Sequence, residues 1–185
     1  MRAVSAVVPA AGLSSRFGGP NKLLQPYKDT TVIGAVVRAL LACDLDVFVV
    51  TGRDAKEVAK ASSPAKAVFN PDYRSGLGTS IARGVRATPP GAILIALGDM
   101  PGLNPKVVKS LLDAQIDDRT IVAPVYFQEP ARRGHPVLFG SAHRAALEAL
   151  SKDEGANSVV LANTLHLELV AVGHGLADID TPTDL

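Results

Sequence analysis

The loop PAAGLSSRFGGPNK, residues 9–22, combines small residues with two basic side chains. Small residues at positions 10–12 let backbone N–H groups approach a ligand closely, and the pair Gly18-Gly19 allows backbone conformations closed to other residues. Arg16 and Lys22 add two positive charges to the same loop. A triphosphate needs many hydrogen-bond donors and diffuse positive charge, so this residue set favours phosphate binding.

The same loop matches neither of the two common nucleotide motifs. A P-loop requires Gly-x-x-x-x-Gly-Lys-Ser/Thr, but the residue five positions after Gly12 is Phe17, and no Gly-x-Gly-x-x-Gly follows the first strand. On its residues alone, the loop could also be a glycine-rich turn with solvated charges. Both interpretations stay open at this point.

Three carboxylates are candidates for holding a divalent ion. Asp99 follows a buried apolar run and precedes Met100-Pro101. Mg²⁺ prefers oxygen ligands of this kind. The alternative, that Asp99 caps the next helix, is weak because Asn104 already stands before Pro105. Asp178 and Asp180 alternate in an extended segment and could face the same site, or they could form a local turn or cap the end of the chain.

Hydrophobic periodicity predicts the elements that must position these residues. The predicted strands cover residues 3–8, 46–51, 67–69, 92–97, 120–124 and 166–172, and the predicted helices cover residues 32–41, 54–61, 79–87, 105–114, 141–150 and 155–162. A polar insertion at 127–136, ahead of apolar residues 137–139, indicates a hairpin or loop that reaches over the sheet edge.

This alternation predicts an α/β fold of three layers, with a mostly parallel sheet and helices on both faces, formed by a single domain over residues 1–185. Ligands in such sheets bind at the carboxyl ends of the strands. The loop 9–22 follows the first strand, and Gly98-Asp99 follows the strand that ends at Leu97. The chemistry-bearing residues therefore fall where the fold class places a ligand.

The composition of the chain argues against nucleic acids and membranes as partners. The chain has 185 residues, 47% hydrophobic and 20% charged, and a formal charge of +1. This balance predicts a globular protein and argues against nucleic acid as the main partner. The one cysteine, Cys43, lies in an apolar helical stretch, which predicts a packing role and fits a reducing compartment. With no membrane-spanning apolar run and no signal-like start, we expect a cytoplasmic protein without a membrane partner.

Five blocks of sequence, taken together, resemble the MobA-like NTP transferases, which attach a nucleotide to molybdopterin. The resemblance is strongest to the molybdenum cofactor cytidylyltransferase branch and spans the chain from Val7 to Leu185. The blocks are AAGLSSRFGGPNK at 10–22, NPDYRSGLGTS at 70–80, LGDMP at 97–101, RGHP at 133–136 and DIDTP at 178–182.

The resemblance implies a role for each block. It implies nucleotide binding by Ala10, Ala11, Gly12, Ser14, Arg16, Lys22, Gly76, Gly78, Ser80 and Asp99, with Arg16, Lys22 and Asp99 as catalytic residues. It implies Mg²⁺ held by Asp99 and Asp180, and an acceptor site formed by Arg133, Gly134, His135 and Pro136.

Simpler interpretations accompany two of these blocks. The glycines at 76 and 78 could serve only a turn, with Thr79 or Ser80 capping a helix. His135 could be a structural histidine bonded to a neighbouring carbonyl, and Arg132-Arg133 could be solvated.

The implied reaction is transfer of CMP from CTP to molybdopterin, a phosphorylated pterin, with release of pyrophosphate. The resemblance implies CTP as the preferred nucleotide over GTP. The guanylyl branch has a second glycine at the positions that match Ala10-Ala11-Gly12 of this chain. One departure concerns the acceptor: the family commonly has Asp-x-Gly-Ala-Arg where this chain has DEGAN at 153–157.

Three other functions stay open. The protein could transfer the nucleotide to another small phosphorylated acceptor. It could be a cofactor-insertion partner of a molybdenum hydroxylase that binds without turnover. It could also be a flavin or nicotinamide oxidoreductase, although no Gly-x-Gly-x-x-Gly favours that chemistry.

Overall fold

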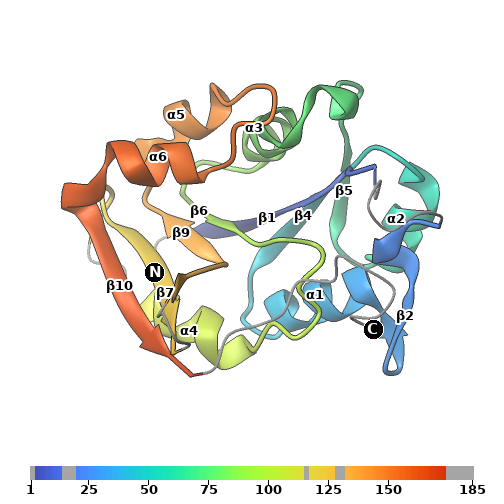
Figure 1. The fold of residues 1–185 in the computed structure, drawn as a ribbon, viewed down its shortest axis with the longest axis horizontal. Coiled ribbons are helices and arrows are strands. Elements are labelled where there is room, and N and C mark those ends of the chain that lie inside the picture. The colour runs from blue at the N-terminus through green and yellow to red at the C-terminus, as the bar shows by residue number, and fades with distance from the viewer. Residues whose placement is uncertain (1–2, 14–19, 115–116, 128–131, 174–185) are drawn as a thin grey trace.

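A computed structural model describes residues 3–13, 20–114, 117–127 and 132–173, and these form an eight-stranded sheet with helices on both faces (Figure 1). The strand order is β10-β7-β9-β6-β1-β4-β5, and β8 pairs with β7. The strands are β1 (Val4–Ala10), β4 (Asp46–Thr51), β5 (Lys66–Phe69), β6 (Ala92–Ile95), β7 (Ile121–Tyr126), β8 (Arg132–Arg133), β9 (Val137–Phe139) and β10 (Leu167–Val172).

Helices join most of these strands. They are α1 (Val32–Leu41), α2 (Ala55–Ala61), α3 (Leu77–Ala87), α4 (Pro105–Asp113), α5 (Arg144–Glu148) and α6 (Asn157–Ala162), with 3-10 turns η2 (Lys22–Leu24), η3 (Tyr73–Ser75), η4 (Ser141–His143) and η5 (Thr164–His166). The predicted start of α4 is confirmed, because the Asn104 side chain accepts a hydrogen bond from the Lys106 N–H at 2.9 Å. Within the described residues, none of the helices has the length and apolarity to cross a membrane.

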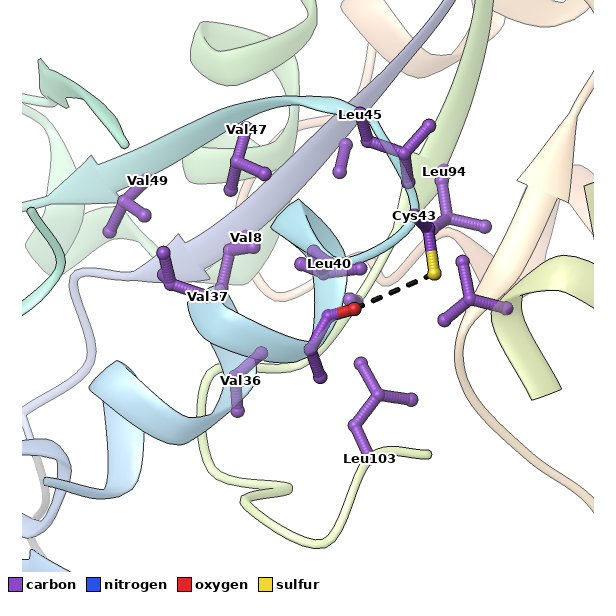
Figure 2. Packing of buried hydrophobic residues seen from close by; sticks show 14 of the residues in the cluster. Val8, Val36, Val37, Leu40, Cys43, Leu45, Val47, Val49, Leu94 and Leu103 are labelled. Atoms are coloured by element: carbon purple, nitrogen blue, oxygen red, sulfur yellow. Dashed lines mark hydrogen bonds between the residues drawn. The ribbon is translucent and has the colours of Figure 1, made fainter. Parts of the chain in front are cut away.

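The core has two layers because alternate residues of each strand point to opposite faces. Ala6 and Val8 of β1 pack on the side of α1 and α4, whereas Val7 packs on the side of α3, α5 and α6. Figure 2 shows the first of these layers, in which Cys43 is buried and its thiol contacts the Ala39 carbonyl oxygen at 3.5 Å. Burial raises the pKa of the Cys43 thiol, in keeping with the predicted packing role.

The sheet is mostly parallel, as predicted, with short antiparallel additions. β1 runs parallel to β4 and β6, and β10 runs parallel to β7. β9 lies antiparallel between β6 and β7, and β8 is antiparallel to β7. The described residues between β7 and β9 form the short strand β8 and no crossover helix, in keeping with an antiparallel return of the chain. Of the polar insertion predicted at 127–136, the described residues 132–136 lead into β9, which lies inside the sheet and not over its edge.

Some predicted boundaries differ from those in the structure. The strand predicted to end at residue 97 ends at Ile95, and the helix predicted over 141–150 divides into η4 and α5. The sequence analysis missed a hairpin of β2 (Pro26–Tyr27) and β3 (Thr30–Thr31). Lys28 in its turn has a φ of 54°, a left-handed conformation that lysine seldom adopts, so residue type gave little warning of the turn.

Candidate functional site

The ends of β1 and β6 lie close together at the carboxyl edge of the sheet. A Cβ atom on Gly98 would lie 3.2 Å from the Pro9 carbonyl oxygen, so glycine allows the two strand ends to approach. The Ala96 N–H donates to the Val7 carbonyl oxygen at 3.1 Å. Asp99 therefore emerges beside the loop that follows β1, as the sequence analysis expected.

Lys22 and Asp99 form an ion pair across this edge, with 2.6 Å between Nζ and Oδ2. Their side chains are 15% and 23% exposed, which makes the pair partly buried. The turn η2 sets the position of Lys22, because the Asn21 side chain caps η2 by accepting from the Leu23 N–H at 3.1 Å. The structure thus joins two of the predicted catalytic residues. The third, Arg16, lies outside the described residues.

The first part of the loop 9–22 continues directly from β1. Ala10 and Ala11 are buried, whereas Gly12 is exposed and a Cβ atom there would meet nothing within 4 Å. The Leu13 carbonyl oxygen accepts a hydrogen bond from the Arg53 guanidinium. Ser14, predicted to bind nucleotide, lies outside the described residues.

The second predicted nucleotide loop is held by its own hydrogen bonds. Asn70, which is 2% exposed, donates from Nδ2 to the hydroxyls of Thr79 and Ser80, each at 3.0 Å. Its Oδ1 accepts from the Asp72 N–H at 3.0 Å. Ser80 is itself buried. Asn70 was missed as a key residue, although an asparagine two positions before an aspartate in a loop is a typical turn signal.

The two glycines of this loop serve a close contact with residues 151–154. Gly76 has a φ of 116°, and a Cβ atom there would lie 2.3 Å from the Lys152 carbonyl oxygen. Gly78 donates its N–H to that oxygen at 2.8 Å, and its own Cβ would lie 2.6 Å from the Ser151 carbonyl oxygen. The glycines therefore serve close packing against residues 151–154 and not a turn alone. The predicted capping by Thr79 or Ser80 is wrong, because α3 begins at Leu77 and its N-cap is Gly76. Nucleotide contact by these glycines stays a prediction.

The predicted acceptor residues 133–136, which we call the acceptor strap, begin with the last residue of β8 and lead into β9. The Arg133 guanidinium donates to the Asn157 side-chain oxygen at the start of α6. Gly134 donates its N–H to the Pro124 carbonyl oxygen at 3.0 Å, and Pro136 is buried. The Asn157 that departs from the family pattern is therefore a partner of Arg133, which sequence reasoning did not foresee.

His135 is largely buried within the strap. Burial lowers the pKa of its imidazole, Arg133 adds to that effect, and the Ile95 backbone and the Asp99 charge oppose it. His135 therefore lies in the electrostatic reach of both Asp99 and Arg133. Its Nδ1 is buried and has no hydrogen-bond partner in the part of the chain that the structure describes.

Asp99 is the described residue best suited to hold a divalent ion. Its carboxylate supplies oxygen ligands at a partly exposed strand end, which fits the preference of Mg²⁺. Among the described residues, no group of three or more His, Cys, Asp or Glu side chains gathers at one point. Asp180 and Asp178 lie outside the described residues, so the predicted second ligand stays a prediction.

A hollow of about 340 Å³ lies between the β2–β3 hairpin, α1 and the residues after Asp99, with Tyr27, Ala39, Pro101 and Pro105 among its lining. Its rim carries the Asp29–Arg38 ion pair, which is 2.8 Å long and mostly exposed. We assign it no role.

Comparison with known proteins places this chain among relatives of stated activity. The family model of the MobA-like NTP transferase domain matches residues 6–167. The chain is 33% identical to nicotine blue oxidoreductase of Paenarthrobacter nicotinovorans over 83% of this chain and 79% of that protein. It is 26% identical to molybdenum cofactor cytidylyltransferase of Escherichia coli K12 over 100% of this chain and 94% of the relative.

Solved structures share the whole fold. Rv0371c from Mycobacterium tuberculosis H37Rv has a TM-score of 0.85 and 28% identity, covering 100% of this chain and 96% of that one. The same protein in complex with manganese has a TM-score of 0.82 and 26% identity, covering 98% and 95%. A nucleotidyl transferase from Methanothermobacter has a TM-score of 0.81 and 28% identity, covering 98% and 94%.

Proposed function

The chain belongs to the MobA-like NTP transferase family, and from this premise we propose that it transfers CMP from CTP to molybdopterin and releases pyrophosphate. The observation that carries the proposal is the Lys22–Asp99 pair at the carboxyl ends of β1 and β6. The Lys22 ammonium can neutralise phosphate charge, and the Asp99 carboxylate can hold a divalent ion. Similarity to the cytidylyltransferase over the whole chain supports the choice of substrates.

The chemistry needs no general base from the protein. A terminal phosphate oxygen of molybdopterin attacks the α-phosphorus of CTP, a new P–O bond forms, and the bond between the α-phosphorus and the bridging oxygen breaks to release pyrophosphate. The attacking phosphate is largely ionised at neutral pH, since its second pKa is about 6. The protein must therefore align the two phosphates and neutralise their charge.

Asp99 is the residue that would hold the divalent ion, with Asp180 as its predicted second ligand. When bound, Mg²⁺ or Mn²⁺ supplies positive charge against the phosphate oxygens. Manganese in the related Rv0371c structure supports a divalent ion in this family. In the described structure the Asp99 carboxylate is paired with Lys22, so an ion that binds Asp99 competes with the Lys22 ammonium.

When a divalent ion binds Asp99, the Lys22 side chain would contact the phosphates instead. Once released from Asp99, its ammonium balances charge on the phosphates, together with the predicted contribution of Arg16. Across the site, Arg133 and His135 of the acceptor strap meet the molybdopterin phosphate and ring. On these assignments the nucleotide lies beside β1 and the acceptor beside β9.

A second candidate function is favoured by one observation, the 33% identity to nicotine blue oxidoreductase. On this alternative the same sheet edge around Lys22 and Asp99 would bind a redox cofactor, and the protein would release no pyrophosphate from any nucleotide. A cofactor-insertion partner of a molybdenum hydroxylase would likewise bind without turnover. A transferase for another phosphorylated acceptor would release pyrophosphate only with that acceptor.

The decisive experiment is a nucleotide panel. CTP, GTP, ATP and UTP are each incubated with the protein, molybdopterin and Mg²⁺ or Mn²⁺, and pyrophosphate is measured. We expect release with CTP to exceed that with GTP by at least tenfold. A preference for GTP would overturn the cytidylyl assignment. No pyrophosphate with any nucleotide, together with reduction of a dye by a nicotinamide cofactor, would favour the oxidoreductase.

A further inference from the structure

One nitrogen of the His135 ring has no hydrogen-bond partner among the residues that the structure describes. Its Nδ1 is the one buried side-chain nitrogen or oxygen without a hydrogen-bond partner among the described residues. An unpaired buried polar atom destabilises a folded protein, so such an atom calls for an explanation. We interpret the unpaired nitrogen as a group whose hydrogen-bond partner is a bound acceptor molecule.

Tyr126, the last residue of β7, fixes the backbone at this point. Its hydroxyl donates to the His135 carbonyl oxygen at 2.6 Å, and Tyr126 is only 5% exposed. The ring of Tyr126 also packs under Gly134, where a Cβ atom would lie 2.7 Å from Cε2. A larger residue at 134 would push the strap away from the tyrosine. The hydroxyl and ring together hold residues 134 and 135 against β7.

The register of the sheet directs the held residue toward Asp99. Ile95 pairs with Val137 in the antiparallel β6–β9 ladder, so His135 lies level with the residues that lead from β6 to Asp99. Asp99 and Arg133 both act electrostatically on the imidazole. Arg133 is in turn held by Asn157. The imidazole therefore lies within the electrostatic influence of the candidate metal-binding carboxylate and of a guanidinium.

We propose that Tyr126 is a positioning residue for the acceptor, acting through the His135 carbonyl to hold the imidazole where it meets a phosphorylated heterocycle. This inference rests on the proposed function and narrows it, since an imidazole and a guanidinium side by side suit a ring with hydrogen-bonding edges that also carries a phosphate. Tyr126 does not contact the nucleotide in this arrangement. Its loss affects the acceptor alone.

The test compares Tyr126→Phe with wild type in two measurements, molybdopterin binding followed by pterin fluorescence without nucleotide, and KM values for molybdopterin and CTP. We expect molybdopterin binding to weaken about 3–10-fold, the loss of one hydrogen bond. The KM for CTP should stay within about twofold. Tyr27→Phe is the matched control, because Tyr27 lies on the separate β2–β3 hairpin and should change neither constant.

A double-mutant cycle with His135→Ala separates positioning from general stability. If Tyr126 acts through His135, the double variant loses no more molybdopterin affinity than His135→Ala alone. Additive losses, equal losses for both substrates, or wild-type affinity in Tyr126→Phe would overturn the inference. Thermal melting confirms that each variant is folded.

The proposed function is judged separately, by wild-type pyrophosphate release. If wild type releases none, the binding measurement still decides the role of Tyr126: a selective loss supports it, and absence of molybdopterin binding by wild type overturns it. If wild type turns over normally and Tyr126→Phe is indistinguishable from it, only the inference about Tyr126 fails.

Discussion

The proposed nucleotide side and the proposed acceptor side of the site are built differently. On the nucleotide side, polar groups satisfy one another: Lys22 pairs with Asp99, and Asn70 bonds to Thr79, Ser80 and the Asp72 backbone. On the acceptor side, the strap is held by its backbone and by Arg133, while Nδ1 of His135 lacks a partner in the described chain. The two sides meet at Asp99.

Lys22 and Asp99 would have to exchange their present ion pair for contacts with a ligand, whereas His135 Nδ1 has no hydrogen bond among the described residues to exchange. A ligand on the nucleotide side has to displace an existing ion pair, so binding there includes the cost of breaking it. A ligand on the acceptor side can meet a ring already in place, which lowers the ordering cost of binding. Four substitutions test that contrast, beginning with the largest expected effect.

Replacing Asp99 with Asn should remove the carboxylate at which the two proposed sides of the site meet. We expect turnover to fall about 10²–10³-fold, because the neutral amide is a poor ligand for a divalent ion and cannot neutralise charge at the strand end. Pyrophosphate release measures the effect. Melting should change little, since the side chain is partly exposed. Asp29→Asn, in an exposed ion pair, is the control, and near-normal turnover by Asp99→Asn would refute the metal role.

Replacing Lys22 with Met sharpens the contrast by removing the competitor for Asp99. Turnover should fall about 10–100-fold because a charge on the phosphates is lost. Mn²⁺ binding without nucleotide, followed by electron paramagnetic resonance, should become about 3–10-fold tighter, since the carboxylate no longer has to leave an ammonium. Weaker or unchanged Mn²⁺ binding would show that the ion pair does not compete with the metal.

Replacing Asn70 with Ala tests whether the nucleotide side depends on its internal bonds. The variant loses three hydrogen bonds around a buried amide, so we expect the free energy of unfolding to drop by about 2–3 kcal/mol. Urea denaturation measures the change. Asn104→Ala removes only a helix cap and should cost about 1 kcal/mol. Equal losses in the free energy of unfolding for Asn70→Ala and Asn104→Ala would show that the hydrogen bonds of Asn70 stabilise the protein no more than a helix cap does.

The smallest effect concerns pH and the acceptor side. Burial holds the pKa of His135 below its ordinary value of 6.5, so its contribution to stability is complete above that value and declines as pH falls through the lower, folded-state pKa. Urea denaturation between pH 8 and pH 5 should show a smaller loss for His135→Asn than for wild type. His166→Asn, at an exposed position, should follow wild type. Parallel curves for all three proteins would contradict the burial effect.

The sequence anticipated much of the nucleotide side and less of the acceptor side. Apolar runs and glycines mark where β1 and β6 end, so the amino-acid pattern alone was enough to put Lys22 and Asp99 at one edge of the sheet. Tyr126 and Asn157 gave no comparable signal, because an aromatic residue at a strand end and an asparagine at a helix start are common in purely structural roles. Asn70 was assigned no part, although its turn pattern was visible.

The sequence by itself determined the order of most strands and helices, though not the β2–β3 hairpin, and the loops that carry the candidate residues. It could do so because hydrophobic periodicity and turn residues act over a few neighbours. Tertiary structure alone decided which distant side chains meet. Lys22 pairs with Asp99 across 77 positions, Arg133 reaches Asn157 across 24, and β9 turns antiparallel between β6 and β7. These contacts depend on strand register and helix packing, which arise from the whole core and leave no trace in a local pattern.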